Sequence, residues 1–178
     1  MATTKWALDA THSEVLFKVK HLLISKVTGQ FQKFDASVET EGDDLGTARV
    51  TFTADVHSVS TNNEQRDAHL RNSDFFDVEK YAQLTFTADK LQKIDDEHYT
   101  ITGTLTMHGI SKQETLHVEY GGMVKDPWGN TRVGFTVTGK VNRKDYGISF
   151  GMVSETGGAL LGYDVEIHVQ AEFVKVVP

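Results

Sequence analysis

Apolar and polar residues alternate one by one over long stretches of this chain, a pattern that buries one face of an extended strand and leaves the other in water. Residues 99–108 place Tyr99, Ile101 and Leu105 on one face and threonines on the other. The same alternation covers residues 14–21, 49–56, 132–141 and 164–173, with shorter stretches at 36–40, 84–88 and 116–120. These stretches predict about eight strands of an antiparallel sheet, because the strands of parallel sheets are usually apolar on both faces.

Turn-forming residues separate successive strands. Residues 41–44, 95–97, 108–109 and 126–130 are rich in Gly, Asp and Asn, which favour tight turns. Strands joined by such short turns form a meander. A sheet with one apolar face must pack against a second layer or curl on itself, and closure also removes exposed edges. We therefore predict an all-β fold, a closed antiparallel barrel rather than a sandwich.

One segment departs from the strand pattern. Thr61 and Glu64 have the spacing of a capping box, which predicts a helix from there to about Arg71. The helix contains few apolar residues, so we expect it to lie beside the mouth of the barrel. The adjacent aromatic residues Phe75 and Phe76 follow it on an irregular stretch.

The composition excludes several classes of partner and chemistry. The chain has 18 Lys and Arg against 25 Asp and Glu, a net charge of −7, and no run of basic residues. Nucleic-acid affinity depends on clustered cations, so we expect no nucleic-acid partner. The chain also has no Cys, which excludes disulfides, thiol catalysis and thiolate metal sites.

The sequence also bears on cellular location. No apolar stretch of the kind found in a secretory leader follows residues 1–6. We therefore expect a cytoplasmic protein, or a periplasmic one if a leader has been removed. No segment approaches the roughly 20 apolar residues of a spanning helix, so membrane contact is expected to be peripheral and transient.

Two patterns leave an enzymatic alternative open. Residues 147–151 match the G-x-S-x-G pattern of a hydrolase nucleophile elbow, with Ser149 as nucleophile, although no helical pattern follows. The eight His are at least nine residues apart, so no pair has the local spacing of a metal-binding motif. A site between strands would use the His expected at the barrel ends, namely His12, His21, His57 and His69. We expect no catalytic residue and no metal site, and keep the hydrolase or metal-dependent enzyme as the alternative.

The predicted interior is the most informative feature for function. The inward faces hold Val, Ile, Phe, Leu, Ala and Gly with almost no charge. A barrel of about eight strands either fills its interior with side chains or holds one small ligand. Small residues at inward positions favour an open tunnel; they are Ala54, Ala88, Gly103, Gly139 and Ala171. An interaction module with a packed interior is a third alternative.

Six groups of residues occur in order along nearly the whole chain. They are Asp9-x-x-His12-Ser13, Phe17-x-x-x-His21, Gly29-x-Phe31, Arg66-Asp67-x-His69-Leu70 with Asp74-Phe75-Phe76, Leu105-x-x-His108-Gly109-Ile110-Ser111, and Asn142-Arg143-x-Asp145-Tyr146-Gly147. With this set, the chain resembles the YceI-like family of polyisoprenoid-binding, lipocalin-like proteins. The resemblance implies an eight-stranded lipocalin-like barrel that carries a long apolar chain, such as an isoprenoid or a fatty amide. It also implies a homodimer and no catalytic step.

These inferences combine into one prediction: residues 1–178 form a single barrel domain that binds a long-chain amphiphile for carriage or storage. Isoprenoids, isoprenoid quinones and fatty amides are the expected ligands, and no other cofactor is expected. The residues expected to contact the ligand are Phe17, Val19, His21, Phe31, Val50, Phe52, Ala54, Phe75, Phe76, Phe86, Leu105, Val133, Phe135, Val137, Ile148, Phe150, Met152, Ile167 and Val169. The polar head group is expected near His21, Arg66, His69, Arg143 and Tyr146.

Overall fold

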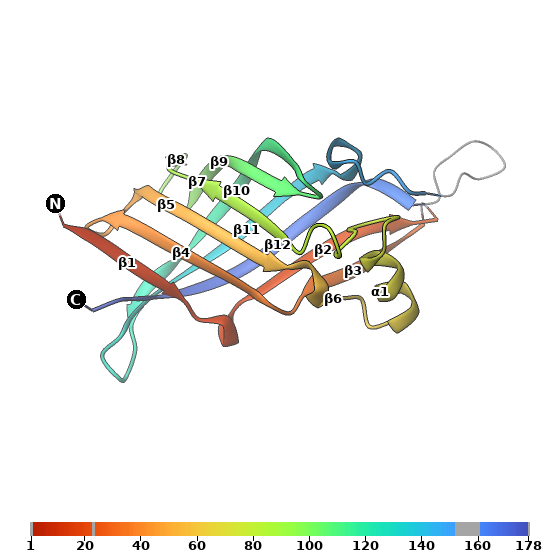
Figure 1. Cartoon of the computed structure of the whole chain (residues 1–178). Coiled ribbons are helices and arrows are strands. Elements are labelled where there is room, and N and C mark those ends of the chain that lie inside the picture. Colours follow the sequence, from red (N-terminus) through yellow and green to blue (C-terminus); the bar gives the residue numbers. More distant parts are fainter. Residues whose placement is uncertain (1, 23, 152–160, 178) are drawn as a thin grey trace.

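The alternating stretches form strands, and the turn residues between them form hairpins (Figure 1). The computed structural model describes residues 2–22, 24–151 and 161–177. The elements, in chain order, are β1 (Thr3–Leu8), η1 (Ala10–His12), β2 (Glu14–His21), β3 (Ser25–Phe31), β4 (Phe34–Glu41), β5 (Asp44–Asp55), η2 (Val56–Ser58), β6 (Val59–Ser60), α1 (Glu64–Arg71), β7 (Gln83–Ala88), β8 (Leu91–Lys93), β9 (His98–Met107), β10 (Ile110–Lys125), β11 (Thr131–Asn142), η3 (Arg143–Tyr146) and β12 (Leu161–Lys175).

Strand β12 closes the sheet into a barrel. On one side β12 pairs with β11, and on the other side it pairs first with β2 and then, through Phe173–Lys175, with β1. Strands β1 and β2 are therefore two halves of one long strand, interrupted by η1. Strands β3 and β4, β5 and β6, and β7 and β8 are related in the same way. Over the described residues all pairs are antiparallel, which confirms the predicted closed, eight-stranded, all-β barrel.

The break between β1 and β2 is held by a cluster of ion pairs. The Asp9 carboxylate accepts a hydrogen bond from the backbone of Thr11 and contacts His12 Nδ1 at 2.7 Å. Arg132 of β11 donates to both Asp9 and Glu172 at 2.8 Å. The hydrogen bond to His12, with those from Thr11 and Arg132, holds the pKa of Asp9 well below its usual range. The cluster thus anchors the broken strand to β11 and β12.

The helix α1 begins with a different cap from the predicted one. Asn63 is the N-cap, and its side-chain oxygen accepts a hydrogen bond from the backbone N–H of Arg66 at 3.0 Å. Thr61 instead donates its hydroxyl and its backbone N–H to Asp67 Oδ1, at 2.6 and 2.8 Å. Asp67 is buried and requires such donors, which is why the prediction of Thr61 as the cap was wrong. The predicted end at Arg71 is confirmed.

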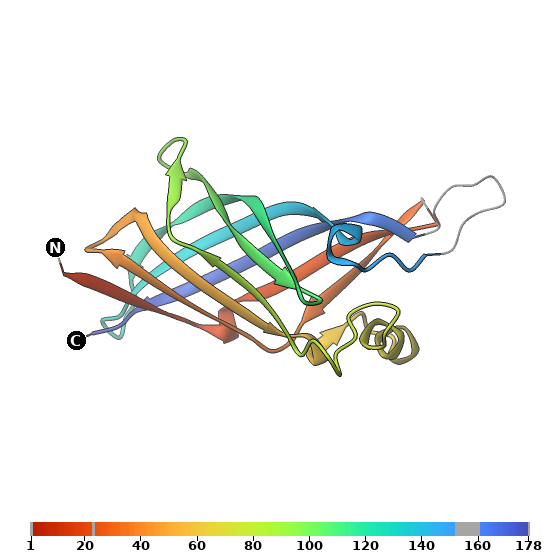
Figure 2. The ribbon, with the colours of Figure 1, turned by 45° about the horizontal axis from the view of Figure 1, so that its top comes forward.

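The helix lies beside one end of the barrel, near the turn that joins β2 to β3 (Figures 1 and 2). Both chain termini lie at the opposite end in these views. In the described part of the chain, no helix has the length and apolar character needed to cross a membrane.

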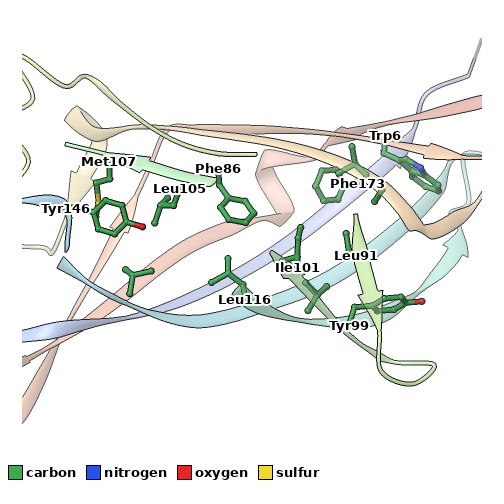
Figure 3. Packing of buried hydrophobic residues seen from close by; sticks show 14 of the residues in the cluster. Trp6, Phe86, Leu91, Tyr99, Ile101, Leu105, Met107, Leu116, Tyr146 and Phe173 are labelled. Atoms are coloured by element: carbon green, nitrogen blue, oxygen red, sulfur yellow. The ribbon is translucent and has the colours of Figure 1, made fainter. Parts of the chain in front are cut away.

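The core lines the inward faces of the strands. Figure 3 shows Trp6, Leu91 and Phe173 grouped toward one end of the interior, and Met107 and Tyr146 toward the other. All five side chains are buried, with Trp6 only 2% exposed. The alternation in β9 thus points its apolar residues inward as the sequence predicts.

Two inward glycines do not leave the open space that the sequence suggests. A methyl group at Gly103 would clash with the Phe86 ring and the backbone oxygen of Thr87, and one at Gly139 would clash with the Leu116 side chain. Large neighbouring side chains therefore lie directly across these glycines, as aromatic residues often do in sheets. The prediction that Gly103 and Gly139 widen the tunnel was wrong, because their space is already filled.

Candidate functional site

The barrel encloses a cavity of about 660 Å³. This volume lies within the roughly 300–1,000 Å³ typical of ligand pockets. The inward faces of the barrel strands line it, together with α1 and with Ile148, Phe150 and Gly151. Among the described lining residues all side chains are apolar except six, which are His21, Thr61, Arg66, His69, Glu114 and Arg143. The interior is therefore open, and the alternative of a packed interior is contradicted.

The cavity opens at one end of the barrel. Leu22 and Phe150 belong to its lining and are also exposed to solvent, at 45% and 37%. At the other end the lining residues Trp6, Leu45 and Phe173 are all buried. In Figure 2, α1 and the β2–β3 turn lie at one end of the barrel and both termini lie at the other. The exposure of these lining residues therefore makes the cavity a tunnel with its mouth at the first end and its closed end at the second.

Most of the residues predicted to contact a ligand line this cavity. They are Phe17, Val19, His21, Phe31, Val50, Phe52, Phe75, Phe76, Phe86, Leu105, Val133, Phe135, Val137, Ile148, Phe150, Ile167 and Val169, together with Arg66, His69 and Arg143 of the predicted head-group set. Ala54 and Tyr146 are not among the lining residues: Ala54 packs in a second core cluster with Val56 and Val59, and Tyr146 is buried behind the wall. Met152 lies outside the described residues.

Arg143 organises the wall at the mouth. Its guanidinium donates to the backbone oxygens of Gly162, Ile148 and Leu161 at 2.8, 2.9 and 3.3 Å, and it lies over the Tyr163 ring at 4.8 Å from the centroid. Burial lowers the pKa of Arg143, but arginine stays protonated in proteins. The guanidinium has five N–H donors, so contacts among the described residues engage only part of its capacity.

Aromatic rings join α1 to the segment after η3. The ring of His69 lies 4.9 Å from both Phe75 and Phe150, and these two phenylalanine rings are 5.1 Å apart, all edge to face. Such aromatic pairs contribute about 0.5–1.5 kcal/mol beyond their area burial. On its other side His69 Nε2 contacts Asp74 Oδ2 at 2.8 Å. The mouth is therefore framed by an apolar cluster with one titratable ring.

The side chain of Arg66 is held by hydrogen bonds to Thr61. Its Nε donates to the Thr61 hydroxyl at 2.7 Å and a terminal nitrogen donates to the Thr61 backbone oxygen at 2.8 Å. Asp67, which accepts from Thr61, completes this network, in which Thr61 and Asp67 are buried and Arg66 is exposed. Arg66 and Asp67 thus have a structural role, because their contacts with Thr61 fix α1 to the segment that precedes it.

Glu114 is a lining residue that the sequence analysis missed. It lies on β10 and accepts a hydrogen bond from the hydroxyl of Tyr146 at 2.9 Å. Burial, and secondarily this carboxylate, raises the pKa of Tyr146. The alternation of the strand could have predicted Glu114 as an inward residue, because it lies two residues before Leu116 and so shares its inward face. Tyr146 thus reaches the cavity indirectly, through the carboxylate it holds.

The predicted nucleophile is not placed for elbow chemistry. Ser149 is exposed and is not part of the cavity lining. A nucleophile elbow requires a helix directly after the serine, whereas residues 148–151 are irregular. Residues 147–151 therefore match that motif in residue pattern but not in backbone structure.

The four histidines of the metal alternative are dispersed. His21 and His69 line the cavity, whereas His12 and His57 do not. Asp9, His12 and Glu172 bring one ligand-type atom each within 4.8 Å of one another. The Arg132 guanidinium contacts both of these carboxylates at 2.8 Å. A fixed cation therefore already offsets part of their charge.

Comparisons with known proteins agree with this geometry. A family model for the YceI-like domain matches residues 6–173. The UPF0312 protein SAS2572 of Staphylococcus aureus (strain MSSA476) is 40% identical over 171 residues, which cover 96% of this chain and 97% of that protein.

Solved structures show the same barrel. The YCEI protein of Campylobacter jejuni has a TM-score of 0.78 and 35% identity, covering 89% of this chain and 90% of its own. A polyisoprenoid binding domain from Saccharophagus degradans, implicated in plant cell wall breakdown, has a TM-score of 0.71 at 16% identity, covering 95% of this chain and 97% of its own. At 16% identity, the similarity to the Saccharophagus degradans domain shows a shared fold only. On the family model and the 40% identical relative, the chain belongs to the family of proteins with a YceI-like domain.

Proposed function

We propose that this protein binds one long-chain amphiphile, such as an isoprenoid, an isoprenoid quinone or a fatty amide, and carries or stores it without chemical change. The observation that supports this proposal is the tunnel of about 660 Å³, lined by apolar side chains and open at one end. The Saccharophagus degradans domain, which has the same fold, is a polyisoprenoid binding domain, and this agrees with the proposal.

The driving force is the burial of the apolar tail. Transfer from water contributes roughly 25 cal/mol per Å² of apolar surface, and this contribution has no preferred direction. Side chains such as Phe52, Leu105 and Ile167 offer contact but no hydrogen bond. We therefore expect tails of different branching and saturation to bind, with the volume of the tunnel as the main selection.

We expect the polar head of the amphiphile to lie at the mouth. His21, Arg66, His69 and Arg143 supply donors there, and Glu114 supplies acceptor oxygens. A head group with both donor and acceptor atoms, such as an amide or a quinone–quinol pair, matches this mixture better than a purely anionic one. Carriage fits the chemistry better than catalysis, because Ser149 lies outside the tunnel lining.

The experiment is extraction of the purified protein with organic solvent, followed by mass spectrometry. The protein is produced in a host rich in isoprenoid quinones and fatty amides. We expect one long-chain lipid per tunnel to be recovered, in an amount that tracks protein concentration. Recovery no greater than from a similarly sized protein without a tunnel would contradict the proposal. Sedimentation of the same sample tests the expected homodimer.

A further inference from the structure

The turn between β2 and β3 carries exposed apolar side chains. Ile24 is 85% exposed and Leu22 is 45% exposed. Leu22 also has a φ of 55°, in the left-handed region that favours Gly or Asn. Turns normally use small or polar residues. Two exposed aliphatic side chains, one of them on strained backbone, do not serve folding, which points to a contact outside the chain.

The strands that lead to this turn are positively charged. Residues 15–34 contain four Lys and no Asp or Glu, in a chain whose net charge is −7. Lys20 lies directly opposite Lys26 in the strand register, with Lys18 two residues away on the same face. Like charges directly opposite each other destabilise a strand pair. Of these lysines, Lys26 contacts Glu166 at 2.9 Å, which offsets only part of the local charge.

This hairpin forms part of the rim of the tunnel. His21 and Leu22 belong to the cavity lining, and so does Phe150, which is 37% exposed. In Figures 1 and 2 the hairpin reaches the end of the barrel that lies away from both termini. Exposed apolar side chains, basic flanks and the tunnel mouth therefore coincide at one end of the molecule.

We propose that the β2–β3 hairpin docks on the surface of an anionic phospholipid bilayer. Leu22 and Ile24 insert into the apolar part of the interface, and Lys18 and Lys20 contact the lipid phosphates. Interfacial binding draws on this combination of a small apolar surface and basic side chains. A bilayer also fits the position of the mouth, since a water-insoluble ligand then passes between membrane and tunnel without crossing water; this last argument rests on the proposed function.

The first test is flotation of the full chain with lipid vesicles. Vesicles of phosphatidylcholine with about 30% phosphatidylglycerol should carry the protein, and pure phosphatidylcholine should carry little, because a basic surface is attracted to anionic lipid. Binding should weaken as salt is raised, because salt screens exposed charges. No flotation with anionic vesicles, even at low salt, would overturn the proposal.

Variants assign the contact to the hairpin. Leu22→Asn with Ile24→Ser, and separately Lys18→Gln with Lys20→Gln, should each lower the vesicle-bound fraction at least about fivefold. Leu22→Asn suits the left-handed backbone, so the fold should be kept, as a thermal melt will show. The matched control is Trp128→Ser, which removes an 81% exposed side chain from the β10–β11 turn near the termini. Loss of flotation in this control, with the hairpin variants unaffected, would contradict the proposal.

A fluorescent probe locates the insertion. The chain has no Cys, so Ile24→Cys and Trp128→Cys each accept a single environment-sensitive label. A blue shift with anionic vesicles is expected for the label at position 24 only, and a shift at position 128 alone would overturn the assignment. Lipid extraction from the Lys18→Gln, Lys20→Gln variant, whose two positions lie outside the cavity lining, separates the two proposals: this variant should keep bound lipid while losing vesicle binding. Vesicle binding by a protein that yields no lipid would refute only the proposed function.

Discussion

Arg143 illustrates how one buried residue shapes the tunnel mouth. Its guanidinium joins the backbone oxygens of Ile148, Leu161 and Gly162, which belong to segments on either side of residues 152–160. The sequence suggests a head-group ligand here because a conspicuous cation stands beside an apolar interior. The contacts show that the same cation is also a structural clamp for the rim.

Replacing Arg143 should therefore destabilise the protein as well as affect binding. We expect Arg143→Met to lower the free energy of unfolding by about 2–4 kcal/mol, because buried carbonyl oxygens lose their charged donor. The control is Lys144→Met, at the exposed neighbouring position, which should change stability by less than about 0.5 kcal/mol. Urea denaturation of the two variants measures the difference. Equal effects would show that Arg143 is not a clamp.

His12 should make stability depend on pH. The hydrogen bond to Asp9 raises the pKa of His12 above its ordinary 6.5, so its stabilisation is complete below that pH and is lost as pH rises through the folded value. The pKa of Asp9 is lowered, so its contribution persists above the ordinary 3.8 and is lost only in stronger acid. Wild type should therefore lose stability as the pH rises above about 6.5.

The variant His12→Gln isolates this contribution. It should lose less stability than wild type over the same pH range, measured by thermal melts. The pKa of His98 is also raised, by Asp95, but this pair is common to both proteins and cancels in the comparison. Identical pH dependence in the two proteins would contradict the assignment to His12.

The strands depend on close pairings between glycines and large side chains. Phe86 lies across Gly103, Leu116 lies across Gly139, and the Phe17 ring lies against Gly29. Each pairing joins two neighbouring strands, as the registers of β7 with β9 and of β2 with β3 show. These glycines set the positions of the large side chains that form the tunnel wall.

Adding one methyl group at such a glycine should be costly. We expect Gly103→Ala to lower the free energy of unfolding by about 1–3 kcal/mol, because the Phe86 ring and the Thr87 backbone must move. Gly134→Ala is the control on β11, where a methyl group meets no atom within 4 Å; it should change stability by less than about 0.5 kcal/mol. Chemical denaturation measures the free energy of unfolding of both variants, and equal losses would refute the packing argument.

Local pattern predicts some elements and misses others. Alternation predicts β9, β11 and β12, because each has an apolar face directed to the interior along most of its length. It misses β3, because Ser25 and Gly29 share the inward face of this strand with Val27 and Phe31 and leave only two apolar side chains there. The N-cap of α1 was also missed, since the choice between Thr61 and Asn63 depends on where the buried Asp67 carboxylate lies.

The tunnel is a property of the whole molecule. Its wall combines inward residues of strands from both ends of the chain, and its mouth combines α1 with the β2–β3 turn and the segment after η3. No single segment contains the site. In a barrel with a packed interior, these inward side chains would form an ordinary hydrophobic core. Here the space between them is open, so they can contact a ligand.

Filling the tunnel should abolish lipid uptake without unfolding the barrel. Val50→Trp places an indole in the cavity, whereas Thr51→Trp places it on the exposed face of the same strand. We expect at least about a tenfold fall in recovered lipid for the first and no change for the second, because the ring occupies the volume of the tail. Circular dichroism should show folded protein in both. Normal lipid recovery from Val50→Trp would contradict binding in the tunnel.

Local physics accounts for the all-β class, the number of long strands, most of their inward faces and the turns between them, since alternation and turn chemistry act over a few residues. Closure depends on pairing residues 6–8 with residues 173–175, at opposite ends of the chain. Whether the interior is open depends on which large side chain crosses which glycine, as Leu116 does at Gly139. These contacts between neighbouring strands depend on the strand register and on the closure of the barrel. Neither can be read from a list of which residues point inward.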